Sequence, residues 1–167
     1  MQVLTETIKE LREKTGAGVI DCKRALEESC GDMDKACGLL TQRGIAIAQK
    51  KATRTADKGV IETYIHLGGK IGAMVELNCE TDFASQTDQF KELAHNIAMQ
   101  ITAMCPQFVS EEEITPGTDI DPQTACLLLQ PYIKDPSKTI QEIITEIIAK
   151  VGENIKVRRF VRFELGC

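Results

Sequence analysis

Two stretches in which apolar and polar residues alternate, at 60–66 and 71–77, constrain the fold of this chain most strongly. A period of two is typical of a β-strand with one buried face. The segment 67–70 between them contains two adjacent glycines, which suit the tight turn of a hairpin. A third alternating stretch at 155–165 predicts a third strand. The chain is therefore expected to form a small antiparallel sheet that is covered on at least one face.

Two amphipathic helices are predicted to cover that sheet. Ser85, with Asp88 three residues later, predicts the start of the first helix, and Pro106 ends it. Ser137 precedes the second helix, which Gly152 terminates. Strands and helices follow one another in runs without βαβ alternation, so the fold class is predicted to be α+β with helices on one face. The apolar stripes of the two helices are Phe90, Leu93, Ala94, Ile97 and Ile101, and Ile140, Ile143, Ile144, Ile147, Ile148 and Val151.

The N-terminal quarter predicts three short helices, at 3–14, 19–29 and from the N-cap Asp32 to Gly44. Such a bundle can bury only a small core, so we expect it to be an appendage of the main domain. The chain then divides into three parts: a three-helix bundle at 1–44, a helical basic linker at 45–57 and an α+β core at 58–167.

Composition excludes several classes of protein. The net charge of −5 argues against a protein that coats nucleic acid, and no apolar run approaches the roughly 20 residues of a membrane span. The N-terminus shows no signal-peptide pattern. The seven cysteines form no C-x-x-C pair and only two histidines accompany them, so we expect no metal site and no cofactor. Most of the cysteines suit a core in a reducing compartment, whereas the terminal Cys167 is available for chemistry.

Catalytic and RNA-binding interpretations have little support. A Cys79 nucleophile with His66 as its base is conceivable across the hairpin, but no recognised catalytic motif is present, and we predict that the chain is not an enzyme. The alternative function is that of a small RNA-binding protein, which would bind RNA through its basic and aromatic last strand. The same residues also fit an ordinary strand whose long charged side chains lie over the sheet. The basic and aromatic residues in question are Lys156, Arg158, Arg159, Phe160 and Arg162.

Two apolar features can lie in a core or on a binding surface. Phe83 closes the polar hexapeptide 78–83, where the hairpin passes into a helix, and its ring can tuck under that helix or point outward. Val19 and Ile20 follow the glycine-containing turn at 15–18, in a bundle that can bury only a small core. They either pack inside the bundle or form an exposed knuckle that docks on a partner.

Three sequence motifs resemble those of one known family. The first is the N-terminal combination Leu11-Arg12, Thr15-Gly16-Ala17-Gly18, Asp21-Cys22-Lys23 and Ala25-Leu26. The second is Asn78-Cys79-Glu80-Thr81-Asp82-Phe83, and the third is Val151-Gly152-Glu153-Asn154-Ile155 with Arg158-Arg159-Phe160. They resemble the motifs of the elongation factor Ts proteins, occur in that family's order and span nearly the whole chain.

The resemblance implies a guanine-nucleotide exchange factor for the translation GTPase elongation factor Tu. It implies that the bundle is a ubiquitin-associated-like module, which docks on the GTPase through Thr15, Gly16, Val19 and Ile20. It also implies that Asp82 and Phe83, preceded by Thr81, wedge between helices of the GTPase near its magnesium site. His66 belongs to a segment that, in long members of the family, contacts the GTPase through a second copy of the core.

This chain departs from the family pattern in two respects. It has one copy of the core, which implies a homodimer, or two copies for each pair of GTPases. The predicted loop at 107–121, followed by a short helix at 122–129, also replaces a longer helical segment. The resemblance implies no membrane and no direct nucleic-acid contact. It implies the bacterial cytoplasm, or an organellar stroma or matrix, as the location.

Overall fold

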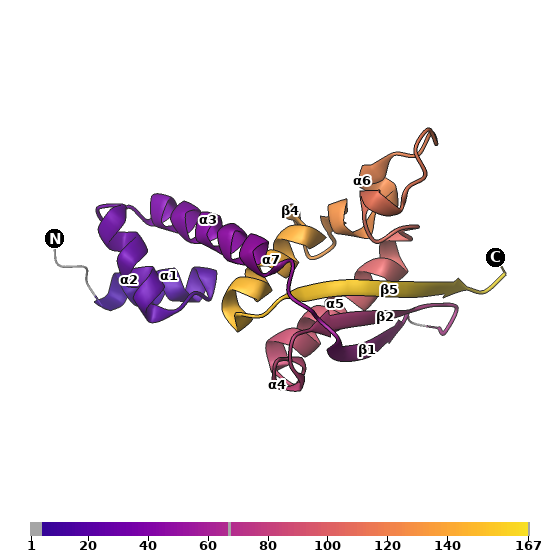
Figure 1. The fold of residues 1–167 in the computed structure, drawn as a ribbon, viewed down its shortest axis with the longest axis horizontal. Helices are drawn as coiled ribbons and strands as arrows, with labels where there is room; N and C mark the ends of the chain where they lie inside the picture. The colour runs from indigo at the N-terminus through magenta and orange to yellow at the C-terminus, as the bar shows by residue number, and fades with distance from the viewer. Residues whose placement is uncertain (1–4, 67, 167) are drawn as a thin grey trace.

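The computed structural model describes residues 5–66 and 68–166 of the chain. Met1–Leu4, Leu67 and Cys167, including the expected helix start at Val3 and the terminal thiol, lie outside the described residues. Figure 1 shows a helical bundle at one end of an elongated molecule and a sheet with its helices at the other. The bundle consists of α1 (Thr5–Thr15), α2 (Val19–Glu28) and α3 (Met33–Lys51).

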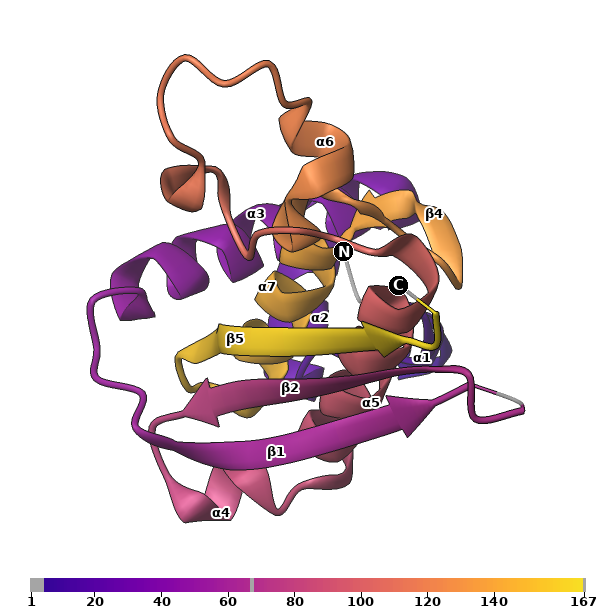
Figure 2. The same cartoon turned by 90° about the vertical axis from the view of Figure 1, so that its right-hand side faces the viewer.

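The predicted α+β architecture is confirmed. Strands β1 (Lys58–Ile65), β2 (Ile71–Cys79) and β5 (Ile155–Glu164) form one antiparallel sheet in the order β1-β2-β5. Two long helices, α5 (Asp88–Met104) and α7 (Ile140–Val151), pack on the same side of it. Figure 2 shows the three strands in front of these helices.

The core lies between the sheet and the two helices because their apolar faces match. Phe90, Leu93 and Ile97 of α5 are almost completely buried, as are Val75 and Leu77 of β2. The predicted stripes therefore supply the main core, whereas Leu11, Cys22, Ala25, Leu26 and Ala36 form a separate small cluster inside the bundle.

Short elements connect the long ones. Helix α4 (Asp82–Ser85) follows β2 directly. The predicted loop after α5 contains the 3-10 turn η1 (Glu111–Glu113), and the predicted short helix is divided into α6 (Pro122–Ala125) and the 3-10 turn η2 (Leu127–Leu129). A small hairpin of β3 (Pro131–Tyr132) and β4 (Asp135–Thr139), which the sequence pattern did not predict, leads into α7.

Three expected helix boundaries are wrong. Gly44 does not end the third helix: α3 continues to Lys51, because the buried Gly44 lets α3 approach Ala149 of α7 closely. Thr87 rather than Ser85 caps α5. Thr139 rather than Ser137 caps α7, in a capping box with Glu142. Gly152 does end α7, with a left-handed φ of 77° that favours glycine.

Candidate partner-binding site

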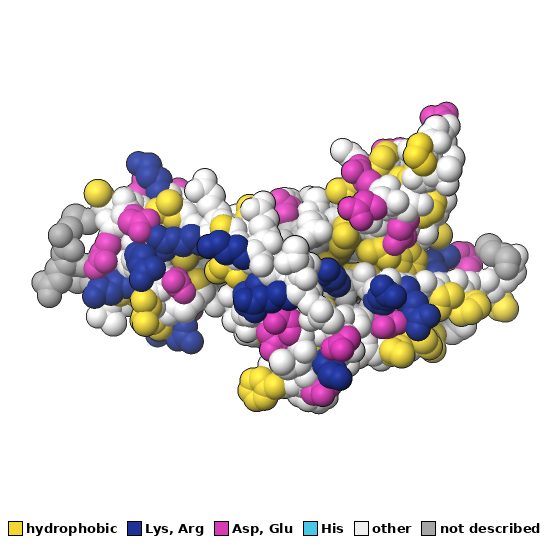
Figure 3. Space-filling view, in the orientation of Figure 1, with side chains coloured by type: hydrophobic (Ala, Val, Ile, Leu, Met, Phe, Trp, Pro, Cys, Tyr) yellow, Lys and Arg dark blue, Asp and Glu magenta, His cyan; other side chains and the backbone are white. Residues whose placement is uncertain are grey.

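The bend between β2 and α4 presents Phe83 to solvent. Thr81 caps α4 through its hydroxyl, which accepts a hydrogen bond from the Ala84 backbone N–H. Ala84 and Ser85 are buried, so the short helix is attached to the core on one side. On its other side Asp82 is exposed and the Phe83 side chain is 84% exposed. Figure 3 shows a hydrophobic side chain that projects from the surface at the position of α4.

Two carboxylates hold this bend against the turn between α7 and β5. Glu153 accepts hydrogen bonds from the Thr81 backbone N–H at 3.0 Å and from the Thr81 hydroxyl at 2.6 Å. Glu80 accepts one from the Asn154 backbone N–H at 2.7 Å and forms an ion pair with Arg54. The Asn154 N–H, with help from Arg54, lowers the pKa of Glu80 below its ordinary value of 4.5.

Cys79 and His66 are not brought together, which argues against the thiol nucleophile. Cys79 pairs with Lys58 at one end of the β1-β2 hairpin, whereas His66 follows Ile65, whose partner Gly72 lies at the other end. The Cys79 side chain is fully buried, and burial raises the pKa of its thiol above the ordinary value. Such a thiol carries little thiolate at neutral pH.

The knuckle predicted on the bundle is exposed. Val19 and Ile20, the first two residues of α2, are 53% and 73% exposed. The preceding turn is held in place, since the Thr15 hydroxyl donates to the Leu11 carbonyl and Gly16 adopts a left-handed φ of 68°. A Cβ at Gly16 would lie 2.6 Å from Cε of Lys150, so this turn also lies close to α7 of the core.

His66 is exposed at the far end of the hairpin. Its Nδ1 lies 3.4 Å from the Tyr64 hydroxyl, and the Tyr64 ring packs edge-on against His95 of α5. The nine-residue strand β2 separates His66 from the bend at Phe83, which corresponds to roughly 25 Å at the usual rise of a strand. The predicted site residues therefore lie at three separate places: the bundle turn, the bend at α4 and the end of the hairpin.

The sequence pattern did not predict an apolar patch on the side of the sheet that faces away from α5 and α7, called the open face below. The alternation in β1 indicated an apolar face, but in the structure Val60 and Tyr64 point toward the helices while Ile61 and Ile65 are exposed. An irregularity in the β2-β5 register at Glu76/Leu77 also shifts the alternation of β5. The exposed apolar residues of the open face are Ile61, Ile65, Met74, Val161 and Phe163.

The basic and aromatic residues of β5 do not share one face. Phe160 packs against the main core, and Arg162 donates to the Thr102 carbonyl on the helix side of the sheet. Arg159 lies opposite Glu76 on the open face and forms an ion pair with it at 2.7 Å. The arrangement therefore provides no continuous basic and aromatic platform of the kind that an RNA-binding sheet uses.

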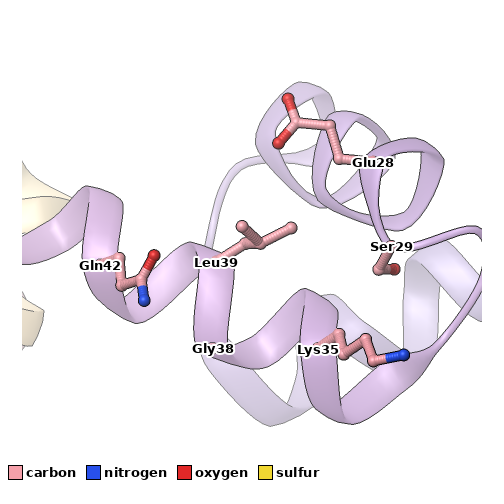
Figure 4. A pocket seen from close by; sticks show the side chains of 6 residues that line it. All are labelled: Glu28, Ser29, Lys35, Gly38, Leu39 and Gln42. Carbon is pink, nitrogen blue, oxygen red and sulfur yellow. The ribbon is translucent and has the colours of Figure 1, made fainter.

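Other surface features add no candidate site. A groove of about 430 Å³ between the end of α2 and α3 is lined by Glu28, Ser29, Lys35, Gly38, Leu39 and Gln42, none of them a predicted site residue (Figure 4). Within residues 5–66 and 68–166, no group of three or more His, Cys, Asp or Glu side chains could hold a metal ion. In the same part of the chain, no helix is both long and apolar enough to cross a membrane.

Comparison with known proteins identifies the family. A family model described as Elongation factor TS matches residues 4–119. The elongation factor Ts of Carboxydothermus hydrogenoformans is 47% identical over 194 aligned positions, which cover 98% of this chain and 89% of the relative. The proteins of the same name from Heliobacterium modesticaldum and Thermodesulfovibrio yellowstonii are also 47% identical, with 98% and 99% of this chain and 90% and 98% of the relatives covered. Because 194 aligned positions exceed the 167 residues of this chain, that relative contains residues with no counterpart here. Relatives that are 47% identical match nearly the whole chain, and the family model matches most of it. The chain therefore belongs to the elongation factor Ts family.

Proposed function

We propose that this chain promotes GDP release from elongation factor Tu by inserting Phe83 and the neighbouring carboxylate of Asp82 beside the magnesium site of the GTPase. Membership of the family implies a nucleotide exchange factor for that GTPase. The observation that carries the insertion mechanism is the Phe83 ring, which is 84% exposed on a bend that is tied to the core. An apolar ring left in water on a fixed support is the kind of group that anchors an interface.

The mechanism requires no proton transfer and follows from linkage. Factor and nucleotide compete for the conformation of one GTPase, so the factor weakens nucleotide binding by the same free energy by which nucleotide weakens factor binding. Each tenfold loosening of GDP requires about 1.4 kcal/mol of coupling. One ring and one carboxylate supply only part of the coupling free energy that a large loss of GDP affinity requires. The bundle and the hairpin end therefore supply the remaining affinity and orientation.

The direct test mixes the purified chain with elongation factor Tu that carries fluorescent GDP and excess unlabelled GTP. We expect the fluorescence to decay faster in proportion to factor concentration until the complex saturates. No acceleration at any concentration would refute the exchange function. A parallel measurement of RNA retention at several salt concentrations tests the alternative, because a phosphate-binding protein loses affinity steeply as salt rises.

The bundle is proposed to dock on the GTPase through Val19 and Ile20, together with the turn at Thr15 and Gly16. Both apolar side chains are exposed at the start of α2, next to a turn that lies close to the Lys150 side chain of α7. This docking supplies affinity, whereas the bend at Phe83 supplies the distortion. The division into a bundle, a linker and a core remains a prediction, although the bundle does have its own apolar cluster.

We expect Val19→Asp to weaken complex formation by about tenfold, because a charge then replaces an apolar side chain that is buried only in the proposed complex. The fold should tolerate the change, since an acidic residue in the first turn of a helix is favourable. Titration of labelled elongation factor Tu measures the affinity. Val19→Thr, which keeps the side-chain shape without adding a charge, is the matched control and should lose less affinity. Unaltered affinity in Val19→Asp would remove the residue from the interface.

The chain is further proposed to act as a homodimer that packs two open faces together. The open face exposes Ile61, Ile65 and Phe163 in water, and a neighbouring groove of about 480 Å³ is lined largely by apolar residues of β1, β2 and β5. A flat apolar sheet face can pack on its own copy around a two-fold axis. His66 lies at the opposite end of β2 from Phe83, and the proposed dimer supplies the His66 contact from the second protomer.

We expect Phe163→Glu to convert the dimer to a monomer, since each protomer would bury an unpaired carboxylate in the proposed interface. Light scattering coupled to size exclusion measures the mass at several concentrations. Ile45→Glu, on an exposed position of α3 away from the sheet, is the control and should leave the mass unchanged. A wild-type chain that is monomeric at every concentration would refute the dimer. Location in the cytoplasm stays a prediction from the family.

A further inference from the structure

The bend that carries Phe83 and the turn that precedes β5 hold each other by exchanged hydrogen bonds. Glu153, in the turn, accepts from the backbone and the hydroxyl of Thr81, in the bend. In the opposite direction, Glu80 of the bend accepts from the backbone N–H of Asn154 in the turn. Each segment therefore uses a carboxylate to bind the backbone of the other. Hydrogen bonds in which the acceptor is ionised are shorter and stronger than neutral ones.

The same turn is anchored on two further sides. Asn154 is only 2% exposed, and its side-chain amide donates to the carbonyl of Arg54 at 2.7 Å. Lys51, the last residue of α3, donates to the carbonyl of Gly152. Ile155, the first residue of β5, is buried in the main core. Glu153 consequently projects from a support that is fixed to the sheet, to α7 and to the end of α3.

Helix α4 depends on this support for its orientation. It has four residues, and a single turn of helix is not stable on its own. The Phe83 ring has almost no contacts of its own within the chain, so nothing on the ring side determines where it points. Ala84 and Ser85 hold the buried side of the turn, and the contact of Glu153 with Thr81 holds the residue that caps its start.

We propose that Glu153 is a positioning residue for nucleotide exchange. By accepting hydrogen bonds from both the backbone N–H and the hydroxyl of Thr81, it fixes the direction in which the Phe83 side chain projects from the surface. This inference rests on the proposed function, in which Phe83 acts on the GTPase. Glu153 itself is not required to touch the partner. Its effect should therefore appear in how fast bound GDP leaves the saturated complex rather than in how tightly the complex forms.

The test is GDP release from fluorescently loaded elongation factor Tu, with the rate measured as a function of factor concentration. We expect Glu153→Ala to lower the maximal stimulated rate by about tenfold while changing the half-saturating concentration by less than about twofold. Glu153→Gln should restore most of the rate, because its amide oxygen can accept from the Thr81 N–H and its amide nitrogen can donate to the hydroxyl. Glu146→Ala, which breaks the surface ion pair with Lys138, is the matched control and should match the wild type.

A double-substitution cycle with Phe83→Ala separates positioning from general stability. If Glu153 acts through the ring, Glu153→Ala should have no further effect once the ring is absent. Two results would overturn the positioning role and leave the proposed function intact. In the first, the fold-reductions in rate of the two single variants multiply in the double variant. In the second, Glu153→Ala has the wild-type rate while Phe83→Ala is slow. A wild-type rate in Phe83→Ala would instead overturn the proposed insertion of the ring, on which this inference rests, without refuting nucleotide exchange by the chain. Should Glu153→Ala fail to fold, Thr81→Val carries the test. This variant removes the hydroxyl bond to Glu153 together with the cap of α4, and a wild-type maximal rate in it overturns the inference.

Discussion

Truncation of Phe83 to alanine is expected to lower the maximal rate of GDP release from elongation factor Tu by about thirtyfold, which corresponds to about 2 kcal/mol and is typical of an interface hot spot. The ring is 84% exposed in the free chain, and in the proposed mechanism it gains its contacts only in the complex. Stopped-flow fluorescence of labelled GDP at saturating factor measures the effect. The free energy of unfolding of the same variant should lie within about 0.5 kcal/mol of the wild-type value, because a solvated side chain contributes little to folding.

The stability measurement distinguishes a lost contact from a damaged fold. If Phe83→Ala is slow in exchange and unfolds at the wild-type urea concentration, the ring acts on the partner. Asp82→Asn is a useful companion variant, since it keeps the size of the neighbouring side chain but removes its charge. Release at the wild-type rate in Phe83→Ala would exclude the ring from the mechanism and would leave the bundle and the hairpin end as the parts that loosen the nucleotide.

Truncation of Phe90 to alanine is expected to have the opposite signature, with a loss of about 3–5 kcal/mol in the free energy of unfolding. Phe90 is fully buried and packs in the main core between α5 and the sheet. Its removal takes away apolar contacts and leaves a cavity that the surrounding side chains fill only in part. Because a domain of this kind has a total stability of about 5–15 kcal/mol, the loss should be visible as a much lower urea midpoint.

Phe90→Leu is the matched control, and its free energy of unfolding should fall much less, since most of the side-chain volume is retained. Any exchange activity that remains in the folded fraction of Phe90→Ala should have nearly the wild-type maximal rate, because Phe83 and its support are unchanged. A loss below about 1 kcal/mol would mean that the core around Phe90 collapses without a cavity. The two phenylalanines thus separate the role of a ring in folding from its role in binding.

The secondary structure and fold class could be predicted because they depend on periodicity within short segments. The stripe from Phe90 to Ile101 has helical spacing, and all of it lies in the core of the structure. The alternation at 60–66 and 71–77 produced the β1-β2 hairpin. The family resemblance likewise rests on contiguous motifs, such as the one from Asn78 to Phe83, which can be read directly from the chain.

Contacts between distant segments decided what the local pattern could not. A glycine in a helical pattern usually marks a helix end, but Gly44 is buried inside α3, because another helix packs against it there. The alternation in β1 indicated that one face is apolar, but not that Ile61 and Ile65 would remain uncovered. The register irregularity between β2 and β5 arises from strand pairing and has no local signal in the sequence.

The candidate site shows the same division. The residues Thr81, Asp82 and Phe83 could be selected from their motif, but whether the ring lay inside or outside required the packing of α4 on its neighbours. Glu153 lies 72 residues from Thr81, and no periodicity connects the two positions. By itself the sequence determined which segments become strands and helices, because those depend on the spacing of apolar residues along a few turns. Only the tertiary structure decided which surfaces stay open and which carboxylate supports the bend, because both depend on which segments meet.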